Sequence, residues 1–374
     1  MYIKKLDVHR LRNLEQIQLS FCPGANLVYG INGSGKTSLL EALYLLGRGR
    51  SFRSRNIRSV IQHDTQDCVV FGQLHDPAGE RDIHIGVQRT RKGEFRFKVN
   101  GEVVPTAAAL VEELPIQLLN SHSFELLEGG PLNRRQFLDW GVFHVEHEYP
   151  GLWKAFHRCL KHRNSLLRRD RIGGRLDDGA TGEMAVWDEE FARLSEQVDQ
   201  SRQAYLSQFK PVFQDILQRL TEVADIGFGY QPGWDSQRPL IEILQETIER
   251  DRKSRTSNYG AHRADLKVKV AGRPAAEVLS RGQIKTVVCA LRIAQGYLYH
   301  QITGKQCVYL LDDLPAELDS HHRQRVGQLL NELGAQVFIT GVFKEDLQAA
   351  WPQEGKSAMF HVEHGVVSPL DSLQ

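Results

Sequence analysis

The segment Gly-Ile-Asn-Gly-Ser-Gly-Lys-Thr at positions 30–37 is the feature that most restricts what this chain can fold into. It has the spacing of a P-loop, in which a glycine-rich turn wraps phosphate groups with backbone N–H groups. The apolar residues 27–29 predict a strand before it, and leucines at 39, 40, 43 and 46 predict a helix after it that ends near Gly47. This order places a helix N-terminus at the phosphates, so we expect an α/β unit that binds a nucleotide.

Every residue of the loop is a candidate nucleotide contact: Gly30, Ile31, Asn32, Gly33, Ser34, Gly35, Lys36 and Thr37. Lys36 is expected to reach the β- and γ-phosphates of ATP and to act in catalysis, while Thr37 is expected to supply a hydroxyl to Mg²⁺. ATP and Mg²⁺ are therefore the predicted cofactors. The alternative, a glycine turn with an exposed lysine, leaves the flanking strand and helix unexplained.

The second motif is Leu-Ser-Arg-Gly-Gln at positions 279–283, which matches the LSxGQ signature of ABC-type ATPases. A helical pattern follows it, so Ser280 can cap that helix and make its N-terminus an anion site. In that superfamily the signature contacts the nucleotide of the opposite subunit. This predicts nucleotide contacts from Ser280, Gly282 and Gln283 across an ATP-dependent head-to-tail homodimer. The alternative is a helix cap without a ligand.

The third motif, residues 307–313, is an apolar strand that ends in Asp312 and Asp313. Such a Walker B element directs Asp312 at Mg²⁺ or its water shell, whereas the alternative is a surface turn without a metal. Asp313 stands where most ABC ATPases have a glutamate as general base, and its shorter reach predicts slow turnover. Asp319 falls at the position of the D-loop aspartate. Thr340 ends a later strand, where transporter ATPases keep a histidine, and is interpreted as a phosphate sensor.

The patterns along the chain predict three segments. Residues 1–128 are the first part of the expected ATPase head, with the P-loop between its strand and helix and then an antiparallel meander with Asn100-Gly101 as a hairpin turn. Charged helical patterns fill 129–255, where Pro211 is expected to kink or break a long amphipathic stretch and 172–183 to join two helices. The α/β character returns over 256–374. The predicted fold is an α/β P-loop ABC-ATPase head, with a mixed sheet and an antiparallel β subdomain, that carries an inserted, mainly helical arm domain.

Composition limits how the chain can contact nucleic acid and where in the cell it is expected. A formal net charge of +1 means that any contact with nucleic acid must come from local basic patches. The five cysteines are widely spaced and contain no CxxC pair, which is typical of a protein of the reducing cytoplasm. Charges interrupt the apolar residues of the N-terminus, and no apolar run is long enough to span a bilayer, so neither secretion nor membrane insertion is expected.

Five motifs in order resemble those of the RecF family of SMC-like ABC-type ATPases: residues 30–46, 129–139, 260–266, 279–285 and 310–319. Ala261 departs from the family, which usually has proline there. The resemblance implies an ATP-closed dimer on DNA at gaps and single-strand/duplex junctions, opened by slow, DNA-stimulated hydrolysis. It also implies RecO and RecR as partners, the loading of RecA, recombinational repair and SOS induction. The rival is the ATPase subunit of a membrane transporter, which disagrees with the long insert and with Asp313. A small-molecule kinase leaves the signature unexplained.

Two basic patches are candidate DNA contacts, although either is also compatible with a solvated surface. The first is the arginine loop, residues 48–58, with Arg48, Arg50, Arg53, Arg55 and Arg58. The second follows a predicted helix and contains Lys154, Arg158, Lys161, Arg163, Arg168, Arg169 and Arg171. The repeated HVEH at 144–147 and 361–364 matches no known metal motif. Arg134, Arg135 and His262 lie in motifs that the family shares, and the sequence alone assigns them no role.

Overall fold

The computed structural model describes residues 1–169 and 178–370, so Arg171 and residues 172–177 of the expected joining segment 172–183 lie outside the described residues. The other half of that segment, 178–183, is helical and does not form a joining loop. The chain divides into two compact units. Unit 1 comprises Met1–Phe124, Asp215–Glu222 and Ser280–Gln374, and unit 2 comprises Glu125–Gln214 and Val223–Leu279. Residues 256–279, which the sequence pattern placed with the returning α/β part, group with unit 2.

The chemistry of unit 1 depends on a six-stranded sheet in the order β15-β14-β3-β13-β12-β8, in which all neighbours except β14 and β15 are parallel. Its strands are β3 (Ala25–Tyr29), β8 (Ile116–Leu119), β12 (Val308–Leu311), β13 (Gln336–Gly341), β14 (Ser357–Glu363) and β15 (Val366–Leu370). Every residue of β12 and β13 is buried, as expected for strands covered on both faces. The carboxyl ends of β3, β13 and β12 lie side by side at one edge of the sheet.

A second sheet of unit 1 is antiparallel, in the order β2-β1-β4-β5-β6-β7. Its strands are β1 (Tyr2–Leu11), β2 (Leu14–Ser20), β4 (Asp67–Asp76), β5 (Arg81–Thr90), β6 (Phe95–Val99) and β7 (Glu102–Val104). Asn100 and Gly101 form the turn between β6 and β7 with φ of 50° and 87°, as a tight hairpin requires. The predicted meander and its hairpin turn are thus present.

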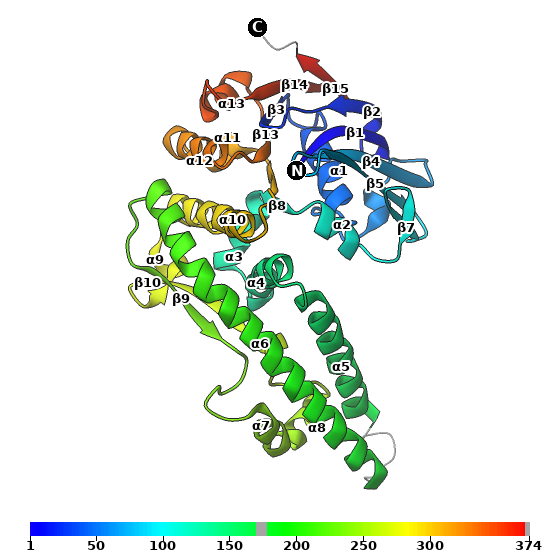
Figure 1. The fold of residues 1–374 in the computed structure, drawn as a ribbon, viewed down its shortest axis with the longest axis vertical. Coiled ribbons are helices and arrows are strands. Elements are labelled where there is room, and N and C mark those ends of the chain that lie inside the picture. The colour runs from blue at the N-terminus through cyan, green and yellow to red at the C-terminus, as the bar shows by residue number, and fades with distance from the viewer. Residues whose placement is uncertain (170–177, 371–374) are drawn as a thin grey trace. The chain divides into compact units, whose positions relative to one another are not determined.

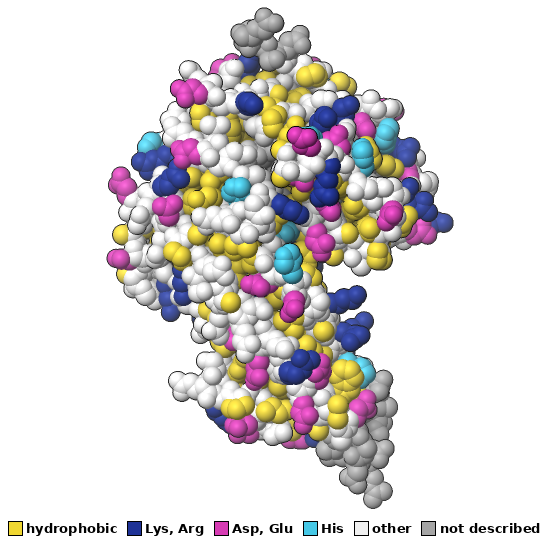
Figure 2. Space-filling model, in the orientation of Figure 1, with side chains coloured by type: hydrophobic (Ala, Val, Ile, Leu, Met, Phe, Trp, Pro, Cys, Tyr) yellow, Lys and Arg dark blue, Asp and Glu magenta, His cyan; other side chains and the backbone are white. Residues whose placement is uncertain are grey.

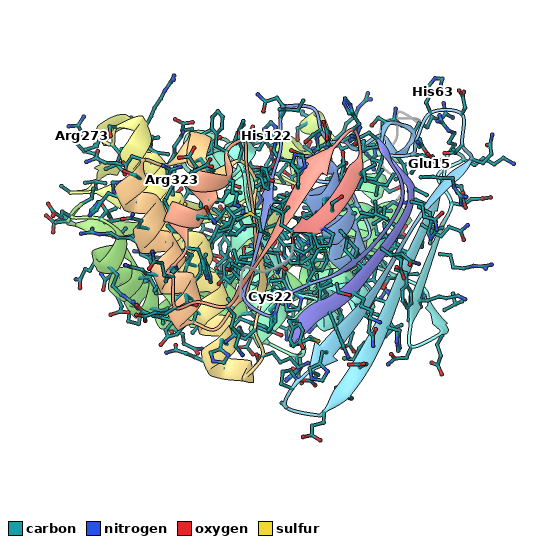
Figure 3. The ribbon with its side chains drawn as sticks, turned by 90° about the horizontal axis from the view of Figure 1, so that it is seen from above. Glu15, Cys22, His63, His122, Arg273 and Arg323 are labelled. Carbon is teal, nitrogen blue, oxygen red and sulfur yellow. The ribbon has the colours of Figure 1, made fainter. Side chains whose placement is uncertain are left out.

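The helices of unit 1 are α1 (Lys36–Arg48), α2 (Ala108–Glu113), α10 (Arg281–Thr303), α11 (Leu314–Glu317), α12 (Ser320–Glu332) and α13 (Lys344–Ala350), with 3₁₀ turns at Ile57–Ser59 and Ser121–Phe124. Seen from above, α12 with Arg323 and the antiparallel strands near Glu15 lie on opposite sides of β14 and β15 (Figure 3). Helix α1 joins both sheets in one core, because its leucines pack with residues of each.

The predicted end of α1 at Gly47 is wrong by two residues. The helix continues to Arg48 and ends at Gly49, which adopts the left-handed conformation with φ of 63°. Gly47 serves a different purpose, since a Cβ there would lie 2.6 Å from Cδ1 of Ile116 on β8. A glycine inside the helix allows this close approach to the sheet.

Unit 2 is mainly helical (Figure 1). It contains α3 (Glu125–Glu128), α4 (Pro131–Val145), α5 (Tyr149–Arg169), most of α6 (Asp178–Leu220), α7 (Leu240–Glu246), α8 (Ile248–Ser254), α9 (Ala275–Val278) and a 3₁₀ turn at Ala261–Arg263. A small sheet joins β9 (Ile226–Gln231), β10 (Asp265–Val270) and β11 (Arg273–Pro274) in the order β11-β10-β9. The predicted fold class, an α/β head with an antiparallel subdomain and a helical insert, is confirmed.

Pro211 does not break α6, which runs through it as one helix of 43 residues. A proline removes one backbone hydrogen bond. Phe209, Phe213 and Ile216 are buried on either side of it, so apolar packing continues past the proline. Among the described residues, none of the helices is both long and apolar enough to cross a membrane.

Candidate nucleotide site

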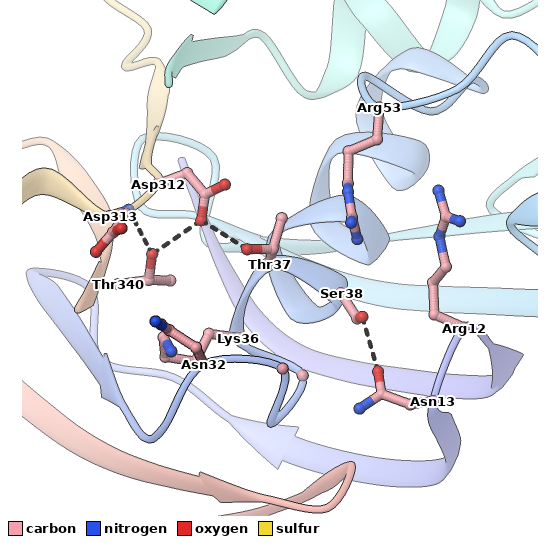
Figure 4. A pocket seen from close by; sticks show the side chains of 12 residues that line it. Arg12, Asn13, Asn32, Lys36, Thr37, Ser38, Arg53, Asp312, Asp313 and Thr340 are labelled. Carbon is pink, nitrogen blue, oxygen red and sulfur yellow. Dashed lines mark hydrogen bonds between the residues drawn. The ribbon is translucent and has the colours of Figure 1, made fainter. Parts of the chain in front are cut away.

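The carboxyl-end edge of the parallel strands opens onto a cavity of about 460 Å³ within unit 1 (Figure 4). Its lining comprises Arg12, Asn13, Asn32, Gly33, Gly35, Lys36, Thr37, Ser38, Arg53, Asp312, Asp313 and Thr340. The fold therefore brings together the P-loop after β3, the two aspartates after β12 and Thr340 on β13. Three predicted contacts, Gly30, Ile31 and Ser34, belong to the same loop but do not line the cavity.

The side chain of Lys36 folds back over the P-loop. Its Nζ donates hydrogen bonds to the carbonyls of Gly30 at 2.7 Å and Ile31 at 3.0 Å. Burial lowers the pKa of Lys36, and the charges of Asp313 and Asp312 oppose that shift. Gly30 permits a close approach, because a Cβ there would lie 2.2 Å from the carbonyl oxygen of Val362. The ammonium group of Lys36 is thus hydrogen-bonded to the carbonyls of its own loop. It can replace these bonds by bonds to phosphate oxygens when a nucleotide binds.

A single hydroxyl links the carboxylate of Asp312 to the backbone of Asp313. Thr340 Oγ1 donates to Asp312 Oδ1 at 2.9 Å and accepts from the backbone N–H of Asp313 at 2.7 Å. Thr37 Oγ1 donates to the same Asp312 oxygen at 3.1 Å. Burial raises the pKa of Asp312, and the hydrogen bonds from Thr340 and Thr37 counteract it. Thr340, interpreted from sequence as a phosphate sensor, is therefore hydrogen-bonded to the Asp312 carboxylate and to the Asp313 backbone.

Asp313 has a left-handed backbone, with φ of 53° and ψ of 42°. This conformation is uncommon for a residue other than glycine, and such residues cluster at functional sites. The hydrogen bond from its N–H to Thr340 holds the backbone in this state. The conformation allows both Asp312 and Asp313 to line the same cavity.

Asn13 and its neighbours frame the P-loop, and no motif in the sequence indicated them. Asn13 Nδ2 donates to the Ser34 carbonyl at 2.9 Å, and Ser38 Oγ donates to Asn13 Oδ1 at 2.8 Å. The N–H of Gly365 donates to the same Ser34 carbonyl at 2.8 Å. The turn between β1 and β2 and the turn between β14 and β15 therefore both support the loop. Only the fold brings these distant turns to it.

The signature residues do not line this cavity. Ser280 caps α10 by accepting from the Gln283 N–H at 3.3 Å, and Gln283 Oε1 accepts from the Ser280 N–H at 2.9 Å. Ser280, Gly282 and Gln283 are all exposed. Within one chain the motif is thus a capping box whose polar groups face solvent.

The motif residues of unit 2 that had no assigned role form ion pairs and hydrogen bonds. Arg134 Nε donates to Asp265 Oδ1 at 2.7 Å, and Arg135 donates to the Ala264 carbonyl at 2.8 Å. His262 Nε2 lies 2.9 Å from the carbonyl oxygen of Ser257, and burial lowers its pKa to about 4. The two arginines tie α4 to the start of β10 and to the residue before it, whereas His262 bonds within the preceding loop.

Similar solved structures define the class of the fold. A structure of the recombination mediator protein RecF with ATP in the RecFOR pathway has a TM-score of 0.86 and 28% sequence identity, and the match covers 99% of this chain and 97% of that one. An Smc head bound to the C-winged helix domain of ScpA has a TM-score of 0.58 at 16% identity, over 99% and 97% of the two chains. The fold is that of an SMC-like ATPase head.

Sequence relatives specify the family. The model of the RecF/RecN/SMC N terminal domain matches residues 2–368. The DNA replication and repair protein RecF of Cellvibrio japonicus (strain Ueda107) is 48% identical, over 98% of this chain and 99% of the relative. The RecF protein of Pseudomonas aeruginosa (strain UCBPP-PA14) is 46% identical, over 100% and 99%. The chain belongs to the RecF family of DNA replication and repair proteins. None of these relatives supports the transporter alternative.

Proposed function

We propose that the cavity binds ATP and that the chain is a weak, DNA-stimulated ATPase that acts as a switch in recombinational repair. The arrangement of Lys36, Thr37 and Asp312 around one cavity carries this proposal. Lys36 and the N–H groups at the start of α1 neutralise phosphate charge, and Asp313 orients the attacking water. The similar RecF structure was solved with ATP, which supports the same ligand here.

The residues present fit Mg²⁺. Thr37 Oγ1 and Asp312 Oδ1 are oxygen ligands 3.1 Å apart, and a magnesium site usually adds waters and phosphate oxygens to one or two such ligands. When bound, the ion neutralises charge on the β- and γ-phosphates. Thr340 would keep the Asp312 carboxylate oriented for that role through its hydrogen bond.

We infer that ATP joins two copies head to tail, with Ser280, Gly282 and Gln283 at the partner's phosphates. The exposure of all three residues at the N-terminus of a 23-residue helix supports this assignment, because an anion there meets free N–H groups. In functional terms, we propose unit 1 as the head and unit 2 as the arm.

DNA, RecR and RecO are the proposed partners, with RecA loaded indirectly at gaps and junctions and SOS induction following. Figure 2 shows Lys and Arg side chains interspersed with Asp and Glu over the face in view, so local patches must provide the DNA contact. Arg50, Arg53, Arg55 and Arg58 of the arginine loop are exposed. The five cysteines are free thiols, which supports the cytoplasm as the location.

The second basic patch is smaller than the sequence indicated. Arg163 is fully buried, with its guanidinium bonded to Asp188 at 2.7 Å and Asp251 at 2.6 Å, so it is not available to DNA. Lys154, Arg158, Lys161 and Arg168 remain exposed on α5. The side chain of Arg169 lies outside the described part of the chain.

Sedimentation with ATP, ADP or no nucleotide, each with and without duplex DNA, tests the proposal. The wild type is expected to dimerise only with ATP and to retain DNA in that state. Lys36→Ala is expected to lose ATP binding and ATP-dependent DNA retention together. An unchanged affinity of Lys36→Ala for ATP would refute the site assignment.

A further inference from the structure

Glu41 is a fully buried carboxylate on α1, the helix that begins at the P-loop. A buried charge is costly unless it is paired and hydrogen-bonded. The pairing here involves two arginines that both line the nucleotide cavity, Arg12 and Arg53. Glu41 itself does not line the cavity, so it can act on a nucleotide only through these neighbours.

The first neighbour, Arg12, connects Glu41 to the P-loop. Its Nε donates to Glu41 Oε2 at 2.8 Å and its Nη2 to Oε1 at 2.9 Å, which is the bidentate geometry that fixes a guanidinium most firmly. Arg12 also donates to the carbonyl of Ser59, and its backbone φ of 53° marks the tight turn between β1 and β2. The next residue, Asn13, holds the Ser34 carbonyl of the P-loop. Glu41 is therefore connected to the P-loop through two neighbours in the chain, since it holds Arg12 and the adjacent Asn13 holds the loop.

The second neighbour is the arginine loop. Ser51 Oγ donates to Glu41 Oε1 and accepts the backbone N–H groups of Arg53 and Ser54, each at 3.0 Å. Arg53 Nη1 lies 3.8 Å from Glu41 Oε2, and its charge acts to lower the pKa of Asp312 across the cavity. Figure 4 shows Arg53 and Arg12 on the side of the cavity away from Asp313 and Thr340. The loop backbone and the cavity arginine thus depend on the same carboxylate.

We propose that Glu41 is a positioning residue that couples the arginine loop to the nucleotide cavity, so that DNA on the loop sets the rate of ATP turnover. This inference rests on the proposed function. DNA phosphates compete with Glu41 for the Arg53 guanidinium and draw Ser51 with the loop. The change in the balance of charges around Glu41 then shifts Arg12, and with it Asn13 and the P-loop.

The test measures ATPase rate against ATP concentration for the full chain, with and without saturating duplex DNA. Glu41→Gln keeps the shape and an acceptor for Ser51 but removes the charge that holds both arginines. Without DNA, the KM of this variant for ATP is expected to rise about fivefold, with a smaller change in kcat. The ratio of its ATPase rates with and without DNA is expected to fall to about 1. Ser51→Ala leaves all three charges in place and is expected to lose the DNA stimulation alone.

Asp67→Asn is the matched control. Asp67 pairs with Arg10 at 2.7 Å in the same unit, yet neither residue lines the cavity. The Asp67→Asn variant is expected to retain the wild-type KM and DNA stimulation. It loses an ion pair, but none of the contacts of Glu41 changes. Equal loss of stimulation in Asp67→Asn would show a general effect of destabilisation and overturn the inference.

The outcomes separate this inference from the proposed function. A wild type that binds ATP but gains nothing from DNA would contradict the proposed DNA-stimulated activity itself. A wild type that is stimulated, together with Glu41→Gln and Ser51→Ala variants that are stimulated equally, would leave the function standing and overturn the coupling. Loss in both variants, with retention in Asp67→Asn, is the expected result.

Discussion

At the scale of single residues, Thr340 has a bonding role that its place in the sequence did not indicate, because it links the Asp312 carboxylate to the Asp313 backbone. One hydroxyl both donates to Asp312 and accepts from the N–H of Asp313, whose left-handed backbone depends on that bond. Removing the hydroxyl leaves a partly buried N–H without its partner, which costs about 1 kcal/mol, the low end of the range for buried groups. The Asp312 carboxylate and the Asp313 backbone would then lose the hydroxyl that links them.

We therefore expect Thr340→Val, which is nearly isosteric, to lower kcat at least tenfold and to raise the Mg²⁺ concentration needed for half-maximal rate. Thr340→Ser keeps the hydroxyl and is expected to remain within about threefold of wild type. Steady-state ATPase assays over a Mg²⁺ titration distinguish the two. Equal ATPase rates for Thr340→Val and Thr340→Ser would mean that the hydroxyl of Thr340 contributes nothing to turnover and that the side chain only fills space.

His262 predicts a pH dependence for unit 2. Burial, together with the charges of Arg263, Arg135 and Arg163, lowers its pKa from 6.5 to about 4, whereas its hydrogen bond to Ser257 acts in the opposite direction. The native state therefore binds a proton less readily than the unfolded chain. Its contribution to stability is complete above pH 6.5 and is lost as pH falls toward 4, by on the order of 2–3 kcal/mol.

We expect His262→Gln, which can still donate to the Ser257 carbonyl, to flatten this dependence. The measurement is the urea midpoint of unfolding from pH 7 to 4.5 for both proteins, monitored in unit 2. Other groups titrate equally in both, so the difference between the two curves isolates His262. Parallel curves would mean that the pKa of His262 is the same in the folded and the unfolded protein.

At the scale of elements, the charges of the arginine loop predict how strongly DNA binding depends on the salt concentration. Each phosphate contact that is lost reduces the slope of log K against log salt by about 0.9. Because Arg53 lines the nucleotide cavity, its reversal would disturb ATP and DNA together. Arg50→Glu with Arg55→Glu avoids this and is expected to weaken DNA binding and reduce the slope by about 2.

Arg96→Glu with Lys98→Glu on β6 provides the control for that pair. Both residues are exposed in the same unit, so the reversal changes the net charge equally at another position. This variant is expected to retain the wild-type slope in filter-binding or anisotropy titrations between 50 and 200 mM salt. If both pairs reduce the slope alike, overall charge and not the arginine loop attracts the DNA.

At the scale of the whole molecule, the proposed dimer separates binding from assembly. Ser280→Arg adds bulk beside the partner's phosphate, so each subunit is expected to bind ATP almost normally but to remain monomeric. Asp313→Asn keeps the shape of the water-orienting group and removes its charge, so its ATP dimer is expected to form and to hold DNA longer. Sedimentation velocity with ATP, followed by DNA dissociation rates, measures both.

Mixing the two variants tests whether the site is shared. A head-to-tail mixed dimer concentrates both changes in one site and leaves the other site with wild-type groups. ATPase above that of either variant alone is expected at concentrations that form mixed dimers. Strict absence of such recovery would place the signature away from the partner's nucleotide.

The sequence predicted the motifs and the fold class because local spacing defines both. The P-loop and Walker B strand are short patterns, and parallel pairing brings their carboxyl ends together. Asn13 and Gly365 were not predicted, because they reach the P-loop only through turns of two different sheets. The burial of Arg163 also escaped prediction, since its partners Asp188 and Asp251 are distant in the chain. These features depend on contacts between residues far apart in the chain, which local sequence patterns do not reveal.

The strand order of the parallel sheet also has a consequence for how the protein is made. Strand β3 lies between β13 and β14, so the P-loop leaves the ribosome long before the strands that flank it. At roughly 5–20 residues per second, about 15–60 s separate the synthesis of Thr37 from that of Thr340. Unit 2 is synthesised entirely within this interval. A chain still in production therefore cannot assemble the cavity, because the strands on both sides of the P-loop strand are made last.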